Sequence, residues 1–188
     1  MSQSVNILGI AGSLRKASYN RGALRAAQEL AAPNATIEIF ELEGIPVFNQ
    51  DEEKPAPERV THFKAKIRAA DAILICTPEY NYSIPGVLKN ALDWASRPYG
   101  DNAWDGKPVA IMGASPGMLG TARAQYHLRQ CFVFLNMCPL CRPELMIADA
   151  GDKFDDDGNL VDQDTRDRIK KLVDALAVWT RQLQKGRQ

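Results

Sequence analysis

The chain has 188 residues, of which 45% are hydrophobic, and its 23 Lys and Arg residues balance 23 Asp and Glu residues. This length and composition fit one well-buried core, and we predict a single domain over residues 1–188. A formal net charge of zero gives no electrostatic reason to expect nucleic acid or an anionic membrane as partner. No apolar run approaches the roughly 20 residues of a membrane span and no signal peptide is recognisable, so we expect a cytoplasmic protein.

Apolar strand-like runs alternate with segments of helical periodicity along the whole chain. The predicted strands cover residues 5–11, 36–40, 72–77, 109–113 and 144–147. The predicted helices cover residues 20–32, 60–70, 84–96, 119–136 and 165–183. This alternation predicts an α/β fold with a doubly wound, five-stranded parallel sheet. In the strand order 2-1-3-4-5, ligands bind beyond the carboxyl ends of the strands, between strands one and three.

The loop after the first strand has the composition of an anion site: it reads Gly12-Ser13-Leu14-Arg15-Lys16-Ala17-Ser18-Tyr19-Asn20. A phosphate there would meet unpaired N–H groups at a helix start, the hydroxyls of Ser13 and Ser18, and the guanidinium of Arg15. The glycine spacing of a dinucleotide loop is absent, as is the Gly-Lys-Ser/Thr of a triphosphate loop. A monophosphate therefore fits best. The alternative interpretation is a plain strand-to-helix turn with a serine cap.

Two further loops are expected at the same edge of the sheet. The loop after the third strand reads Pro78-Glu79-Tyr80-Asn81-Tyr82-Ser83. Prolines at both of its ends restrict the backbone, which suits recognition of the polar edge of a flat heterocycle, and the tyrosines supply stacking surface. The loop at residues 114–120 is rich in glycine, so its backbone can approach a ligand closely.

Cysteines and acidic residues raise two alternatives. We expect the four cysteines to be free, buried thiols: Cys76, Cys131, Cys138 and Cys141. The Cys138-Pro139-Leu140-Cys141 spacing leaves a thiol-redox or zinc site as an alternative. The run at residues 155–159 has the look of a calcium loop, but Lys153 stands where the first carboxylate is required, so we predict a solvated turn.

Together these loops resemble those of the NADPH-dependent FMN reductase family, flavodoxin-like reductases of quinones, chromate and azo dyes. The resemblance is carried by Gly12-Ser13-Leu14-Arg15, by residues 78–94 and by Ser115-Pro116-Gly117. It implies FMN as cofactor and NAD(P)H as co-substrate. It also implies three groups of FMN-binding residues: Ser13, Leu14, Arg15, Ser18 and Asn20 at the phosphate; Pro78, Glu79, Tyr80, Asn81 and Tyr82 at the isoalloxazine edge; and Ser115 and Gly117 on the other side of the ring.

The predicted loops contain no histidine and no catalytic triad or paired carboxylates, so we predict no catalytic residue and no metal, and the chemistry belongs to FMN. We expect a hydride from NAD(P)H to pass through the flavin N5 to quinones, chromate, azo compounds or free flavin, in a two-electron, ping-pong reaction. The resemblance further implies a homodimer or homotetramer. The alternative function is a flavodoxin-type one-electron carrier, a class that is usually strongly acidic, which the zero net charge opposes.

Overall fold

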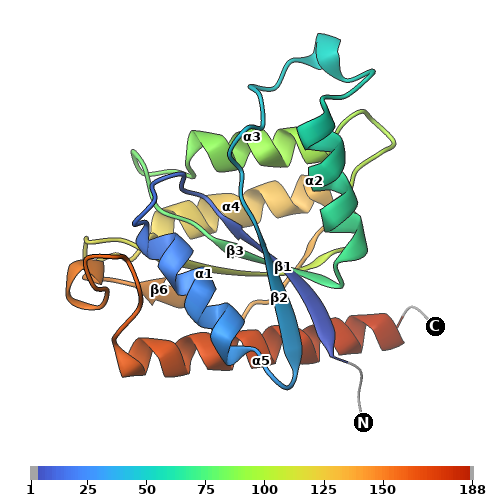
Figure 1. Cartoon of the computed structure of the whole chain (residues 1–188). Coiled ribbons are helices and arrows are strands. Elements are labelled where there is room, and N and C mark those ends of the chain that lie inside the picture. The colour runs from blue at the N-terminus through green and yellow to red at the C-terminus, as the bar shows by residue number, and fades with distance from the viewer. Residues whose placement is uncertain (1–3, 187–188) are drawn as a thin grey trace.

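A computed structural model describes residues 4–186 as one parallel sheet covered by helices on both faces (Figure 1). The sheet has the order β2-β1-β3-β4-β5, and a further strand, β6, also pairs with β4. The strands are β1 (Val5–Ala11), β2 (Ala35–Phe40), β3 (Ala72–Cys76), β4 (Pro108–Ala114), β5 (Cys138–Pro139) and β6 (Leu145–Ile147). The helices are α1 (Tyr19–Leu30), α2 (Glu58–Ala69), α3 (Gly86–Ala95), α4 (Ala122–Leu135) and α5 (Gln163–Lys185). Short 3-10 turns lie at Gln50–Glu52 and Ala150–Asp152.

The central strands are apolar on both faces, as expected for strands buried between two helical layers. β3 and β4 are fully buried along their length. Alternate side chains of β1 enter opposite cores: Ile7 packs with α1 and α5, whereas Leu8 and Ile10 pack with α2, α3 and α4. The flavodoxin-like arrangement predicted from the sequence is therefore confirmed.

Helix α3 begins at Gly86, two residues later than predicted, because Pro85 has extended backbone and precedes the helix as its cap. Helix α4 begins at Ala122 instead of residue 119. The reason is a turn in which Gly120 and Thr121 both have positive φ, 53° and 74°, a conformation that no helix contains.

The fifth strand position was predicted as one segment and consists of two. Pro108 pairs with Cys138 in β5, and Met112 pairs with Leu145 in β6. The N–H groups of Cys138 and Leu140 donate to the carbonyls of Lys107 and Val109, so Pro139 between them faces the free edge of the sheet, where a proline costs no ladder hydrogen bond.

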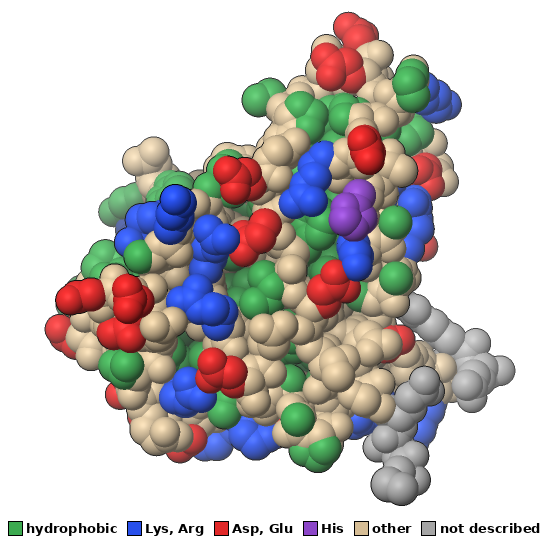
Figure 2. All heavy atoms as spheres, in the orientation of Figure 1, with side chains coloured by type: hydrophobic (Ala, Val, Ile, Leu, Met, Phe, Trp, Pro, Cys, Tyr) green, Lys and Arg blue, Asp and Glu red, His purple; other side chains and the backbone are tan. Residues whose placement is uncertain are grey.

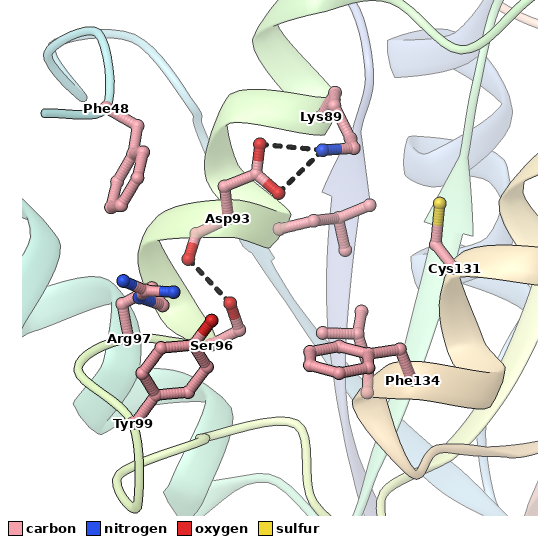
Figure 3. Close-up of a pocket in the computed structure, with 10 residues that line it drawn as sticks. Phe48, Lys89, Asp93, Ser96, Arg97, Tyr99, Cys131 and Phe134 are labelled. Carbon is pink, nitrogen blue, oxygen red and sulfur yellow. Dashed lines mark hydrogen bonds and ion pairs between the residues drawn. The ribbon is translucent and has the colours of Figure 1, made fainter. Parts of the chain in front are cut away.

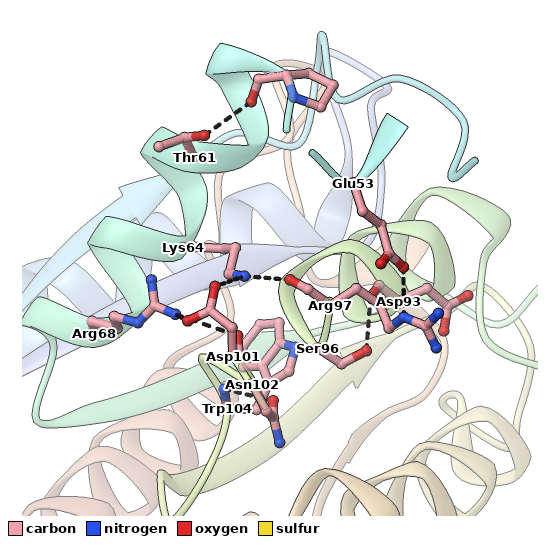
Figure 4. A network of polar contacts seen from close by, with 11 residues as sticks. Glu53, Thr61, Lys64, Arg68, Asp93, Ser96, Arg97, Asp101, Asn102 and Trp104 are labelled. Atoms are coloured by element: carbon pink, nitrogen blue, oxygen red, sulfur yellow. Dashed lines mark hydrogen bonds and ion pairs between the residues drawn. The ribbon is translucent and has the colours of Figure 1, made fainter. Parts of the chain in front are cut away.

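A network of charged side chains fixes the end of α3 that is remote from the loops after β1, β3 and β4 (Figure 4). The buried ammonium of Lys64 in α2 lies 2.6 Å from the carboxylate of Asp101 and also donates to the carbonyl of Arg97. The hydrogen bond from Lys64 lowers the pKa of Asp101. Arg97 in turn pairs with Glu53 at 2.7 Å, so the proline-containing loop before α2 is tied to the same point.

Candidate functional site

Three loops meet at the carboxyl edge of the sheet, where β1, β3 and β4 end side by side (Figure 1). The backbone N–H of Gly12 donates to the carbonyl of Cys76 at 2.9 Å, and the N–H of Thr77 donates to the carbonyl of Met112 at 3.0 Å. These bonds continue the ladder one residue past each strand. They bring the loops at residues 12–18, 77–85 and 115–121 next to one another, as predicted.

The first loop presents a set of free backbone donors at the start of α1. Ser18 donates its N–H to the carbonyl of Arg15 at 3.1 Å, and Arg15 donates its N–H to Ser13 Oγ at 3.3 Å. Within residues 4–186, six other backbone N–H groups of this segment donate to no protein acceptor: those of Ser13, Leu14, Lys16, Ala17, Tyr19 and Asn20. Free donors at a helix N-terminus are the donor set that binds a phosphate.

The side chains of this loop fit the same ligand. Ser13 and Ser18 are buried, and the Ser18 hydroxyl has no protein partner within the described residues. Ser18 stands at the N-cap position of α1, but its side chain makes none of the capping hydrogen bonds that the plain-turn interpretation requires. The guanidinium of the exposed Arg15 lies 5.1 Å from the centre of the Tyr19 ring, which holds it near the loop.

Asn20, which the prediction placed at the phosphate, has a side chain that is engaged inside the protein. Its buried side chain donates to the carbonyl of Ala114 and accepts the N–H of Ala114, both at 2.9 Å, and it also accepts from Cys76 Sγ at 3.3 Å. The amide group is thus committed to β3 and β4. Its position ties the start of α1 to the end of β4, and the backbone N–H of Asn20 is what remains in the donor set.

The loop after β3 is a tight hairpin turn. Tyr80 and Ser83 exchange two backbone hydrogen bonds of 3.0 Å, and Asn81 and Tyr82 between them have φ of 50° and 67°. This is the pattern of a type I′ turn, which requires positive φ at both central residues. Asparagine adopts positive φ readily, whereas tyrosine rarely does. Tyr80, Asn81 and Tyr82 are all exposed. Ser83 Oγ lies 2.8 Å from Nδ1 of His127 in α4, which further restrains the turn.

Glu79 uses its carboxylate to anchor the turn to α4. The side chain is only 7% exposed, pairs with Arg123, and accepts the N–H of Ala124 at 3.1 Å. The guanidinium of Arg123 lies 3.5 Å from the centre of the Tyr82 ring. The hydrogen bond to Glu79 raises the pKa of Arg123. Both oxygens of the Glu79 carboxylate therefore have partners within the protein.

Sequence reasoning missed Arg123, although one signal was available. A cation in the first turn of a helix opposes the helix dipole, and Arg123 is the second residue of α4. Such a residue needs a nearby carboxylate. Glu79, in a loop that ends beside α4, is that partner.

The loop after β4 borders a cavity of about 250 Å³ that also touches Glu79 and Arg123. Ser115 Oγ accepts the N–H of Gly117 at 3.1 Å. A Cβ atom on Gly117 would meet only Ser115 Oγ, at 3.6 Å, so the surface above this glycine is open. The cavity therefore has a backbone floor on one side and the Glu79–Arg123 pair on the other.

A second cavity, of about 320 Å³, lies between the outer parts of α3 and α4 (Figure 3). The rings of Phe48, Tyr99 and Phe134 surround it, and Lys89 pairs with Asp93 at its rim at 2.7 Å. Tyr99 and Phe134 are 76% and 79% exposed. This apolar surface is separate from the three loops and holds none of the predicted FMN-binding residues.

The cysteines differ from the prediction of buried thiols. All four are free, but only Cys76 is fully buried; Cys131 and Cys138 are half-buried and Cys141 is exposed. The short strand β5 places Cys138 at the sheet edge, and the chain then leaves the sheet at Cys141. Burial raises the pKa of the Cys76 and Cys131 thiols.

Two features of residues 4–186 concern metal ions and membranes. No group of three or more His, Cys, Asp or Glu side chains is placed to hold a metal ion. None of the helices described combines the length and the apolar composition that a bilayer crossing requires.

Comparison with known proteins gives consistent matches over most of the chain. The family model "NADPH-dependent FMN reductase" matches residues 5–152. An NAD(P)H-dependent FMN reductase of Pseudomonas aeruginosa is 52% identical over 184 residues, covering 97% of this chain and 99% of the relative. A 2-hydroxy-1,4-benzoquinone reductase of a Burkholderia species is 43% identical over 178 residues, covering 95% and 97%. The solved structure of FerB, an NAD(P)H:(acceptor) oxidoreductase from Paracoccus denitrificans, superposes with a TM-score of 0.87 at 37% identity, covering 95% and 98%.

Proposed function

This chain belongs to the NADPH-dependent FMN reductase family, and from that premise we propose that it is an FMN-dependent enzyme that passes electrons from NAD(P)H to quinones. The observation that carries the proposal is the run of free N–H donors before α1, at the edge of the sheet from which the loop bordering the cavity at Glu79 and Ser115 also starts. That donor set fits the phosphate of FMN. The neighbouring cavity is lined on one side by backbone, which fits the edge of a flat ring.

FMN, when bound, supplies the hydride chemistry of its N5. The protein's own groups would bind FMN and orient it. The N–H groups of the first loop, the Ser18 hydroxyl and Arg15 would hold the phosphate, with the exposed Leu14 beside it in the loop. Pro78, Tyr80, Asn81 and Tyr82 border the ring in a turn whose shape is set by its two hydrogen bonds and by Glu79. Ser115 and Gly117 supply the opposite border.

We propose that NAD(P)H and the acceptor use the same open face one after the other, which makes the reaction ping-pong. The cavity beside Gly117 is open above the backbone, so acceptors of different shape can enter it. We propose quinones as the principal acceptors, and chromate, azo compounds and free flavin as further acceptors that the open cavity admits. Among the described residues that line the cavity, the one carboxylate, that of Glu79, is paired with Arg123 and accepts from Ala124, so it is not a free acid or base.

Anaerobic rapid mixing of the FMN-loaded protein with NADPH tests the function. We expect the flavin absorbance to bleach rapidly and to return when 1,4-benzoquinone is added in a second mix. Initial rates at several fixed quinone concentrations should give parallel double-reciprocal lines. Slow or absent bleaching would favour the one-electron carrier instead, and intersecting lines would contradict the ping-pong order.

We also propose that copies of the chain associate through α3 and α4. Phe134 on α4 lines the second cavity and is 79% exposed (Figure 3), and Tyr126 and Val133 on the same helix are 52% and 83% exposed. Exposed apolar surface of this kind marks an interface. Light scattering should give the mass of a homodimer or homotetramer, and Phe134→Asp should lower it. Val178→Asp, on α5, is the control because Val178 is also exposed, at 52%. A monomer in the wild type would contradict the proposal.

Four free cysteines fit a reducing compartment. On this basis we propose that the protein acts in the cytoplasm.

A further inference from the structure

A basic groove runs between α1 and β2, outside the three loops described above. Its volume is about 410 Å³, and its lining consists of Lys16, Arg21, Arg25, Gln28, Ile39 and Glu41. Figure 2 shows Lys and Arg side chains gathered along α1 on this face of the molecule. Three cations and one carboxylate line the groove, and the carboxylate of Asp155 in the adjacent turn also interacts with Arg25, so one net positive charge remains there, although the whole chain has a formal net charge of zero.

Part of this positive charge is free to bind a ligand. Glu41 pairs with Arg21 at 2.7 Å. Arg25 uses one nitrogen, Nη2, which donates to the carbonyl of Gly158 and to Asn159 Oδ1, both at 2.9 Å. Its Nη1 and Nε have no protein partner within residues 4–186, and neither does the exposed ammonium of Lys16. A guanidinium held on one side and open on the other is suited to phosphate oxygens.

The acidic turn at residues 155–159 holds Arg25 in this position. Asp155 accepts the N–H of Asn159 at 2.7 Å through Oδ1 and the N–H of Gly158 at 2.9 Å through its carbonyl. The turn lies directly on α1 at Gly22, where a Cβ atom would come within 1.9 Å of the Gly158 carbonyl oxygen. The turn that the sequence predicted as merely solvated therefore packs on α1 and positions a side chain of the groove.

Lys16 connects the groove to the phosphate loop, because it lies between Ser13 and Ser18 and also lines the groove. We propose that the groove binds the 2′-phosphate of NADPH, with Arg25 as the residue that distinguishes NADPH from NADH. This inference rests on the proposed function, which makes a nicotinamide dinucleotide a substrate. An arginine near the ribose is a known solution for accommodating the 2′-phosphate in other dinucleotide sites, and NADH carries no group to meet this charge.

Isothermal titration of the FMN-loaded protein with adenosine 2′,5′-bisphosphate and with 5′-AMP tests the groove without turnover. We expect the bisphosphate to bind more tightly than 5′-AMP. Arg25→Gln should weaken the bisphosphate about tenfold or more, as expected for losing a charged hydrogen bond, and leave 5′-AMP unchanged. In steady-state assays the same variant should raise KM for NADPH by a similar factor, with kcat and the KM for NADH unchanged.

The matched control is Lys66→Gln, because Lys66 pairs with Glu38 of β2 at 2.6 Å outside the groove. It should change neither titration. Equal weakening of the bisphosphate and 5′-AMP by Arg25→Gln, or no weakening, would overturn the inference. A loss of FMN affinity in Arg25→Gln would assign the groove to FMN and overturn it too. Failure of the proposed function is seen separately, as absence of flavin bleaching by NADPH in the wild type, and the bisphosphate titration can still be read in that case.

Discussion

The side chain of Asn20 donates to the carbonyl of Ala114 and accepts its backbone N–H, at 2.9 Å in both directions. This pair of bonds joins the N-terminus of α1 to the carboxyl end of β4. It therefore fixes the distance between the phosphate loop and the loop that contains Ser115 and Gly117.

Asn20→Ala should lower both stability and FMN affinity. The substitution leaves the buried N–H and carbonyl of Ala114 without partners, which costs about 1–3 kcal/mol of unfolding free energy. Urea unfolding of the FMN-free protein measures this loss, and equilibrium dialysis measures the affinity. Asn102→Ala is the control, because Asn102 also bonds in both directions, to the Leu135 carbonyl and the Trp104 N–H, but lies away from the site. Equal FMN affinity in the two variants would mean that Asn20 only supports the fold.

Arg15→Ala should weaken FMN and leave riboflavin unchanged. The guanidinium is exposed and contacts only the Tyr19 ring within the described residues, so the fold does not depend on it. Loss of a charge-assisted contact with a phosphate should cost about 1.5–3 kcal/mol of binding free energy. Equilibrium dialysis with both flavins checks this, with the exposed Lys171→Ala on α5 as control. An equal loss for riboflavin, which has no phosphate, would argue against the assignment.

The coupling energy between Glu79 and Arg123 should be larger than that of an exposed ion pair. A double-mutant cycle of Glu79→Gln and Arg123→Ala should give about 1 kcal/mol or more, because Glu79 is almost buried and also bonds Ala124. The same cycle for Lys170 and Asp174, a largely exposed pair on α5, should give about 0.3–0.5 kcal/mol. Chemical denaturation of the wild type and of the three variants of each cycle supplies the free energies of unfolding. Equal coupling in the two cycles would show that Glu79 is not a special anchor of the turn.

The cysteines should react in order of exposure. At pH 8 a thiol reagent should modify Cys141 first and Cys138 next, while Cys76 should react only on unfolding because burial raises its pKa and blocks access. Cys131 should react slowly, because partial burial also raises the pKa of its thiol. Cys138→Ser/Cys141→Ser should keep its turnover with NADPH and a quinone. Loss of turnover with FMN still bound would revive the thiol-redox alternative.

The fold was predictable because its strands are continuous apolar runs and its helices have one apolar face. Local signals were weaker at ends and turns. Gly120 and Thr121 delay α4 through their positive φ, which hydrophobic periodicity does not register. The two short strands beside β4 follow from pairing between distant segments, which a strand of two residues cannot signal by itself.

The loops of the candidate site were predictable from composition, but the use of each side chain was not. The amide of Asn20 is directed to Ala114 and the carboxylate of Glu79 to Arg123, and both partners lie at least 44 residues away in the chain. The hydrogen-bond partner of each of these side chains depends on where the strands end in the folded protein, which the local sequence does not show. For the same reason the groove beside α1 could not be foreseen, since Arg25 is positioned by Gly158 and Asn159.

Gly113→Ala should change the spacing between the loops after β3 and β4 without removing any side chain that could contact FMN. It therefore tests whether this spacing by itself affects FMN affinity. A Cβ at residue 113 would lie 2.0 Å from Thr121 Oγ1 and 2.3 Å from the Thr77 carbonyl oxygen, so the loops after β3 and β4 must move apart. We expect a loss of about 1–3 kcal/mol in unfolding free energy from overpacking. FMN affinity should fall as well, although Gly113 itself donates no side chain to the site.

Gly86→Ala is the matched control, because a Cβ there meets nothing within 4 Å. It stands at the first residue of α3, where alanine is a better helix former than glycine. Thermal unfolding and FMN titration of both variants give the comparison. If Gly113→Ala lowers stability but leaves FMN affinity intact, the spacing between the two loops is not what positions the ring, and the site must then depend on the phosphate loop alone.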